Sequence, residues 1–201
     1  CRYILSLIVL LAGLSCSKET ELPEDRMQFN PSLPFSSTKA TDTAFEPSDA
    51  IGIYVVDESA GDLELSGNWA NNAKGVFDGQ DWDISPAIYW NGESRFNVYS
   101  YYPYSRDVNS VEDFRFPLQL DQRGDGYTLS DFMWAKCLSA SREDGPVDLH
   151  FTHRLSRIDV NLVKGEYYEG ELPQDAVVKI HGTVPVALVD LKSGDIVKDP
   201  E

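Results

Sequence analysis

Residues 47–56, Pro-Ser-Asp-Ala-Ile-Gly-Ile-Tyr-Val-Val, begin with turn-forming residues and continue as an apolar segment. In an extended chain, Ile51, Ile53 and Val55 fall on one face, and positions 52, 54 and 56 fall on the other. A period of two residues, rich in β-branched side chains and bounded by turn residues, predicts a β-strand. The rest of the chain has to supply the strands and surfaces that cover it.

Further short β segments follow this strand. Residues 68–80 are polar and contain glycine, and we expect a loop there. Residues 84–90 lead into Asn91-Gly92, the dipeptide that most strongly predicts a β-hairpin, and residues 96–101 alternate after it. Residues 114–120 carry an apolar side chain at every second position, which predicts a half-buried strand.

The apolar pattern changes register between residues 149 and 162. Leu149, Phe151, His153 and Leu155 occupy odd positions, whereas residues 158, 160 and 162 are apolar at even positions. Because a shift of one residue turns every side chain to the other face, we expect a bulge or bend near residues 156–157.

The C-terminal part continues the β pattern. We expect strands at residues 177–180 and 184–191, a turn at 193–195, and an unpaired strand starting at Ile196. No segment sustains a helical period of 3.6 residues. The fold class is therefore all-β, and a sandwich is the expected architecture.

The N-terminal segment resembles an export signal. Arg2 precedes an apolar run from Tyr3 to Leu14, which is too short to span a membrane, and Ser15 and Cys16 follow. This order is typical of a bacterial lipoprotein signal peptide covering residues 1–15, cleaved so that a lipid-modified Cys16 becomes the first residue. The alternatives are an ordinary secretory signal or a buried apolar helix.

Composition excludes several classes of function. The chain has 17 basic and 33 acidic residues, a formal net charge of −16, which argues against a nucleic-acid partner. Cys137 has no expected disulfide partner once Cys16 is acylated, and we interpret it as buried apolar filler. A domain of this size needs neither a disulfide nor a metal to fold.

No catalytic or metal-binding pattern is present, and we expect no enzyme activity and no cofactor. His150 and His153 would lie on opposite faces of a strand, so they could share an ion only across a bulge, and we interpret His153 as a core residue. The stretch Asp121–Gly126 lacks the ligands of a calcium loop and is read as a turn, although it contains Arg-Gly-Asp.

The aromatic residues allow two interpretations. Trp69, Trp82 and Trp90 could form an exposed platform that stacks on sugars, as a glycan-binding surface lipoprotein of a polysaccharide-uptake system would need. Alternatively, these rings pack in the core and across strands. We favour packing and keep the three tryptophans as candidate ligand contacts.

Several segments in order resemble the fimbrillin family, particularly its Mfa-like branch. The segments are Asp49–Tyr54, Ile88–Trp90 with Phe96–Tyr104, Asp131–Ala135, and Leu149–Ile158 with its Phe-Thr-His-Arg-Leu-Ser-Arg-Ile. Together they extend from about Pro47 to Leu162. Ser48 and Ser100 depart from the family's glycine and alanine at those positions.

The resemblance implies a tandem of transthyretin-like β-sandwich domains and a role in surface fimbriae. On this basis we expect a lipidated tether with a removable first strand at 16–45, an N-terminal β-sandwich domain at 46–163, and the truncated start of a second β domain at 164–201. The implied protein is a fimbrial subunit, anchor or accessory protein in cell adhesion, lipid-anchored at the cell outer membrane and exposed there or in the fimbrium. Its expected partners are other subunits and host or bacterial surface ligands.

The resemblance also implies assembly by strand exchange. A trypsin-like protease would remove the first strand, and a strand from another subunit would fill the groove. The candidate processing site is the bond between Lys39 and Ala40, with Arg26-Met27 second. The family often has arginine before the cut, where this chain has lysine.

Overall fold

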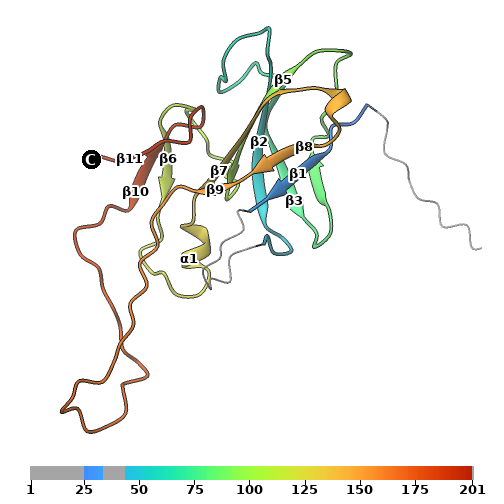
Figure 1. Ribbon diagram of the computed structural model, residues 1–201. Coiled ribbons are helices and arrows are strands. Elements are labelled where there is room, and N and C mark those ends of the chain that lie inside the picture. The colour runs from blue at the N-terminus through green and yellow to red at the C-terminus, as the bar shows by residue number, and fades with distance from the viewer. Residues whose placement is uncertain (1–24, 34–43, 201) are drawn as a thin grey trace, which may run out of the picture.

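The computed structural model describes residues 25–33 and 44–200, which form β-strands with very little helix (Figure 1). The strands are β1 (Phe29–Ser32), β2 (Ala50–Asp57), β3 (Ala70–Phe77), β4 (Trp82–Ser85), β5 (Phe96–Tyr102), β6 (Phe114–Pro117), β7 (Met133–Ala140), β8 (Val147–His150), β9 (Thr152–His153), β10 (Val186–Val189) and β11 (Ile196–Lys198). Two short helical turns, α1 (Gly126–Leu129) and η1 (Arg142–Asp144), interrupt them. The predicted all-β class is confirmed.

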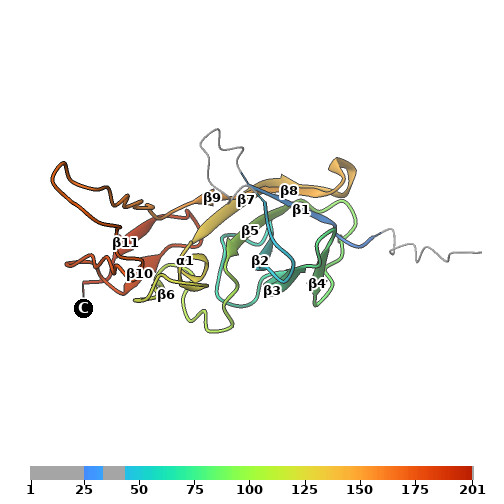
Figure 2. The same cartoon turned by 90° about the horizontal axis from the view of Figure 1, so that it is seen from below.

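The strands form three sheets. A six-stranded antiparallel sheet has the order β4-β3-β2-β5-β7-β9. β1 and β8 form a parallel pair, and β11-β10-β6 form an antiparallel sheet. Figure 2 shows β1 and β8 along one side of the large sheet and β6, β10 and β11 grouped at one end.

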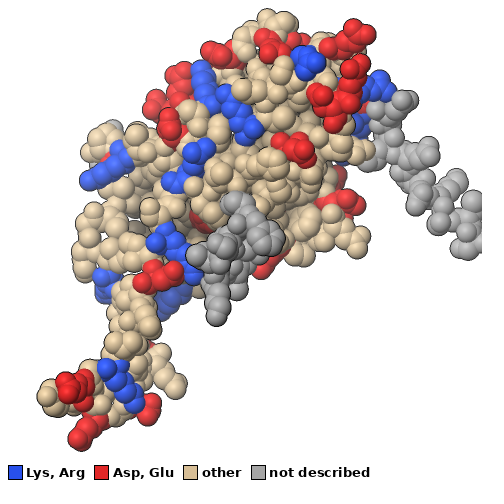
Figure 3. Space-filling view, in the orientation of Figure 1, with Lys and Arg blue, Asp and Glu red and all other residues tan. Residues whose placement is uncertain are grey.

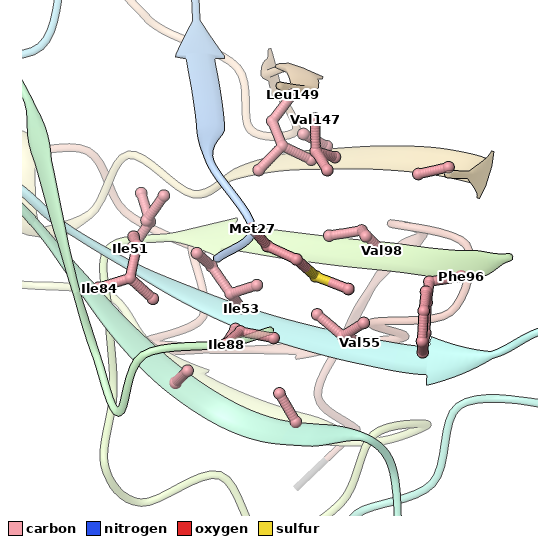
Figure 4. Packing of buried hydrophobic residues seen from close by; sticks show 14 of the residues in the cluster. Met27, Ile51, Ile53, Val55, Ile84, Ile88, Phe96, Val98, Val147 and Leu149 are labelled. Carbon is pink, nitrogen blue, oxygen red and sulfur yellow. The ribbon is translucent and has the colours of Figure 1, made fainter. Parts of the chain in front are cut away.

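β2, which contains the apolar residues 51–56, lies inside the large sheet between β3 and β5. Both of its faces are buried, which explains why nearly all its positions are apolar or small. Ile51, Ile53 and Val55 contribute to a first core cluster beneath β1 and β8 (Figure 4). Tyr54 and Val56 contribute to a second cluster, shared with β6 and β10. The predicted alternation is therefore confirmed, with a core on each side.

Two local predictions are wrong. Residues 70–77, expected within a loop, form β3, because small side chains such as Ala73 and Gly75 fit against β2 and β4 on either side. The Asn91-Gly92 turn does not join a hairpin. β4 pairs with β3, whereas β5 pairs with β2 and β7. The residues of a turn determine where the chain reverses direction, but they do not determine which strands become hydrogen-bonded neighbours.

The register change predicted near residues 156–157 is not found: Leu149 and Phe151 are buried at odd positions, and residues 158–162 are exposed. The chain leaves β8, which pairs with β1, and enters β9, which pairs with β7, at Phe151. Residues 154–185, called the arm below, then form no helix or strand and extend from the body (Figure 1). The strands expected at 158–162 and 177–180 are therefore absent from this structure.

The C-terminal segment packs back on the body. β10 forms within the predicted 184–191 strand and pairs with β6, and Val189 and Leu191 are buried. The strand at Ile196, predicted to be unpaired, pairs with β10 as β11, so that prediction was wrong. Tertiary contact with β6 supplies the surface that makes this hairpin stable.

The described residues include no helix of the length and apolarity that a bilayer crossing requires. The predicted signal peptide at 1–15, the predicted lipidation site Cys16 and the predicted Lys39–Ala40 processing site all lie outside the described residues.

Candidate functional site

The feature that stands out from the sheet packing is the N-terminal segment 25–33, which lies between two other parts of the chain. On one side, Met27 N–H donates to the Ile88 carbonyl at 2.9 Å, and Trp90 N–H donates to the Asp25 carbonyl at 2.8 Å. On the other side, β1 runs parallel to β8, with Val147 N–H donating to the Gln28 carbonyl at 2.8 Å. The segment is thus an inserted strand with backbone partners on both edges. We call the space it occupies the β1 groove.

Alternate side chains of this segment enter the first core cluster. Met27 is only 2% exposed and lies between Val147 and Leu149 of β8 and the large sheet (Figure 4). Phe29 and Leu33 pack partly buried against the same cluster. Full burial of one such side chain contributes about 1.5–3 kcal/mol, so Met27 is the main apolar anchor of the segment.

Polar side chains between the apolar ones bind the rim of the groove. Asn30 Nδ2 donates to Asp148 Oδ1 at 2.7 Å, and Ser32 Oγ lies 2.8 Å from His150 Nδ1. Arg26 donates from Nη2 to the Ile84 carbonyl at 3.4 Å. These contacts are mostly exposed, so each contributes less than the burial of Met27.

A small hollow of about 90 Å³ lies where the segment ends, lined by Leu33, Glu46, Asp49 and Asp131 among others. Tyr102 donates its hydroxyl hydrogen bond to Asp49 Oδ1 at 2.9 Å. Burial, together with the charge of Asp49, raises the pKa of the Tyr102 phenol, so this proton stays in place at neutral pH.

The histidines are not gathered into a site. His153 was predicted to be a core residue, and that prediction is wrong: it is exposed and places Nδ1 2.9 Å from Asp131 Oδ1. His150 contacts Ser32, and His181 lies exposed in the arm. Across residues 25–33 and 44–200, no three His, Cys, Asp or Glu side chains lie close enough to hold a metal ion.

The three candidate tryptophans have different surroundings. Trp90 is buried at 9% exposure, and Trp82 packs against Phe45 and Phe77. Trp69 is 46% exposed, and its Nε1 donates to the Tyr89 carbonyl at 2.8 Å. Trp69 and Trp90 both lie beside Phe96, whereas Trp82 lies against other rings. The structure thus brings two of the three together.

Cys137, predicted to be buried filler, lies on β7 and is partly buried against the first core cluster. Burial raises the pKa of its thiol, with the charges of Asp148 and Asp144 adding to the effect. A raised pKa makes the thiol less reactive at neutral pH.

A removable first strand is expected from the sequence within residues 16–45, where β1 lies, but the sequence alone does not assign the residues of the strand or of the groove. The alternation of Met27 and Phe29 was visible but short, and its continuation through Pro31 and Leu33 could have identified the strand. The bonds from Asn30 and Ser32 to β8 join residues 118 positions apart, and no local pattern signals them.

Comparison with protein families adds a decisive match. A family model described as fimbrillin-like covers residues 38–201. The chain belongs to the fimbrillin-like family. No curated protein matches it.

Solved structures give the fimbrillin-like chain a related fold. A candidate cell adhesion protein from Bacteroides ovatus aligns with a TM-score of 0.59 at 15% identity, covering 88% of this chain and 68% of that one. A fimbrial protein from Bacteroides ovatus gives 0.48 at 23% identity, covering 65% and 29%. A candidate cell adhesion protein from Bacteroides uniformis gives 0.46 at 23% identity, covering 64% and 47%. The matched part therefore spans less than half of the last two proteins.

Proposed function

We propose that this fimbrillin-like protein is a surface-exposed fimbrial subunit, anchor or accessory protein in cell adhesion, and that it assembles by β-strand exchange. Family membership supports a place at the cell surface, and the related structures described as fimbrial or cell adhesion proteins support the same role. A structural role of this kind requires no catalysis and no cofactor.

The observation that supports strand exchange is that residues 25–33 lie as a strand between residues 88–90 and β8. The segment has hydrogen-bonded neighbours on both edges and one fully buried anchor, Met27. Removing such a strand would leave unpaired backbone groups beside an apolar slot, which is a surface that accepts another strand. A cut at the proposed Lys39–Ala40 site would separate this segment from β2 in sequence.

The anchoring part of the proposal concerns Cys16. We propose that it is lipidated and holds the protein at the outer membrane, because two or more acyl chains give stable anchoring. We also propose the domain division stated above, in which residues 164–201 open a second β domain. The exposed apolar side chains of the arm support further β structure around that segment, among them Val177, Val178 and Ile180.

The test is the intact mass and N-terminal residue of protein purified from its native outer membrane, before and after a trypsin-like protease. A lipidated Cys16 that is trimmed to Ala40, together with ladders resistant to sodium dodecyl sulfate, is the expected result. A chain that is trimmed to Ala40 and stays monomeric would contradict assembly by strand exchange, and a chain that is never cut, keeps its lipid and stays monomeric would reject the role of stalk subunit.

A glycan-binding surface lipoprotein is the second candidate. Trp69 favours it, because this half-exposed ring borders a hollow of about 230 Å³ lined by Asp62, Glu64 and Asn68. Stacking on a sugar requires an exposed aromatic face beside polar groups. If this role is correct, Trp69→Ala should abolish retention on immobilised polysaccharide while the circular dichroism spectrum shows that the chain still folds, whereas unchanged retention would eliminate Trp69 as the contact.

A further inference from the structure

The turn that leads into β5 holds an asparagine whose side chain is unbound. Asn91 is exposed, and Ser94 N–H donates to its carbonyl at 3.0 Å, so Asn91 is the first residue of a β-turn. Within the part of the chain that the structure describes, neither the Asn91 side-chain amide nor the Gly92 N–H makes a hydrogen bond. Both groups are therefore free to react with each other.

Gly92 leaves the approach between these two groups open. Its φ angle is +57°, in the left-handed region that favours glycine, and a Cβ atom placed on it would meet nothing within 4 Å. The Gly92 nitrogen is joined to Asn91 Cγ through the Asn91 carbonyl carbon, Cα and Cβ, so a bond between them closes a succinimide ring. Because Gly92 has no side chain, no substituent crowds the nitrogen as it approaches Cγ.

The other described asparagines lack one or both of these features. Asn91-Gly92 is the only Asn-Gly pair in the chain. Asn109 is also exposed and has an unbound side chain, but it precedes Ser110, whose Cβ crowds the attacking nitrogen. Several others use their side chains in hydrogen bonds, namely Asn30, Asn68, Asn71, Asn72 and Asn97. Asn109 is therefore the natural comparison for Asn91.

We propose that Asn91 is a site of self-modification, at which the Gly92 nitrogen attacks Asn91 Cγ. The nitrogen loses its proton and bonds to Cγ, the Cγ–Nδ2 bond breaks, and Nδ2 leaves as ammonia with that proton. Water then opens the succinimide ring at either carbonyl. Opening at Cγ gives aspartate, whereas opening at the main-chain carbonyl gives isoaspartate, in which the chain continues through Cγ. Each event consumes one water and releases one ammonia.

Both products carry a carboxylate in place of a neutral amide. The chain already has a formal net charge of −16, and Figure 3 shows acidic side chains at several places on one face of the molecule. The exposed Glu93 lies two residues beyond Asn91. Conversion therefore adds a negative charge close to an existing one, and the modified chain should separate from the unmodified chain by anion exchange.

The position of Asn91 gives the isoaspartate form a structural consequence. Trp90, immediately before it, is buried, and its N–H donates to the Asp25 carbonyl at 2.8 Å, which closes one edge of the β1 groove. Isoaspartate adds a methylene group to the main chain directly after Trp90. This lengthening shifts the turn relative to Trp90, so the hydrogen bond to Asp25 should open more often. Aspartate leaves the main chain unchanged and should preserve the bond.

Incubation of the purified full chain at neutral and at higher pH tests the modification. Digestion in acid stops the reaction, mass spectrometry then counts peptides with one oxygen in place of one NH group, and an isoaspartate methyltransferase labels isoaspartate. Asn91 should convert at least ~tenfold faster than Asn109. The rate should rise with pH, because a base must remove the Gly92 proton. Asn91→Gln, which would require a larger ring, should abolish the isoaspartate label at this position.

Two results would overturn the self-modification. Asn91 that persists in the folded protein for as long as the denatured chain takes to convert would show that the turn protects it. Conversion to aspartate without isoaspartate would indicate direct hydrolysis of the amide instead of ring closure.

Asn91→Asp is the matched control for the structural consequence, because it adds the charge without lengthening the main chain. Hydrogen exchange of the Trp90 amide should be faster in the isoaspartate form than in Asn91→Asp or in the unmodified protein. Equal exchange in all three forms would overturn the predicted loosening of the groove edge.

Discussion

The contact between Gly52 and Tyr101 shows how a single residue sets the spacing of the core. A Cβ atom placed on Gly52 would lie 2.2 Å from Tyr101 Cε1, a distance that packed atoms do not reach. The Tyr101 hydroxyl is held in place by Asn72 Oδ1 at 2.8 Å and by the Ser105 carbonyl at 2.9 Å. The ring therefore cannot move away easily, and only glycine fits.

Gly52→Ala should lower the free energy of unfolding by about 1–3 kcal/mol, because overpacking forces the Tyr101 ring or the β2 backbone to shift. Urea unfolding measures the loss. Gly165→Ala is the matched control, since a Cβ there meets nothing within 4 Å. Equal stability of the two variants would contradict the close contact.

Because three tyrosine phenols are buried, we expect the free energy of unfolding to decrease in alkali. Burial raises the pKa of Tyr54 from its ordinary value of 10.0 to about 12, and it also raises the pKa of Tyr101 and Tyr102. The unfolded chain then releases these protons first, so the stabilisation present below pH 10 should decline as pH rises toward 12.

Titration of tyrosinate absorbance with parallel unfolding curves checks this prediction. Tyr54→Phe should flatten the alkaline decline, whereas Tyr167→Phe, at a position 90% exposed, should leave it unchanged. If both variants lose stability in alkali as much as the unmodified protein does, Tyr54 is excluded as a cause.

At the scale of elements, the N-terminal segment 25–33, which contains β1, is held mainly at one residue. One residue, Met27, is fully buried, whereas the polar contacts of Asn30 and Ser32 are exposed. By contrast, β2 is paired along both edges and buried on both faces. The N-terminal segment can therefore detach at lower cost than β2.

Met27→Ala should cost about 2–5 kcal/mol, because the shortened side chain leaves a cavity beneath β8. Asn30→Ala should cost about 1 kcal/mol, since it removes one exposed hydrogen bond. Hydrogen exchange of the Val147 and Phe151 amides, which donate to the segment, should accelerate more in the first variant. Equal acceleration in both variants would show that the polar rim holds β1.

At the scale of the whole molecule, the arm separates residues 25–153 from β10 and β11 along the sequence, although β10 packs against β6 in the fold. The chain leaves the body at residue 154 and returns at β10, which pairs with β6 and buries Val189 beside Phe114. A break in the arm therefore removes covalent connection but leaves the second core cluster intact.

Brief trypsin treatment should cut the arm after Arg157, Lys164 or Lys179, and the C-terminal fragment should stay bound. Native mass spectrometry would show the nicked complex, and denaturing conditions would separate its fragments. Val189→Asp should release the fragment, because it places a carboxylate inside that cluster. Dissociation of the unmodified nicked chain would contradict independent packing of β10 and β11.

The sequence by itself determined the class of this fold and several of its strands. The two-residue periods at 51–56, 96–101 and 114–117 arise from local backbone geometry, in which alternate side chains point to opposite faces, so they can be read directly. The ordered segments from Asp49 to Ile158 also pointed to the fimbrillin-like family, which the family match confirms.

Only the tertiary structure decided which strands pair and where function could reside. The polar residues 70–77 become β3 because β2 and β4 satisfy their backbone, and the Asn91-Gly92 turn leads to a strand whose neighbours lie elsewhere in the chain. The β1 groove joins residues 25–33 to 88–90 and 147–151. Hydrogen bonds and burial across such separations depend on the packed chain as a whole, and no local pattern of residues encodes them.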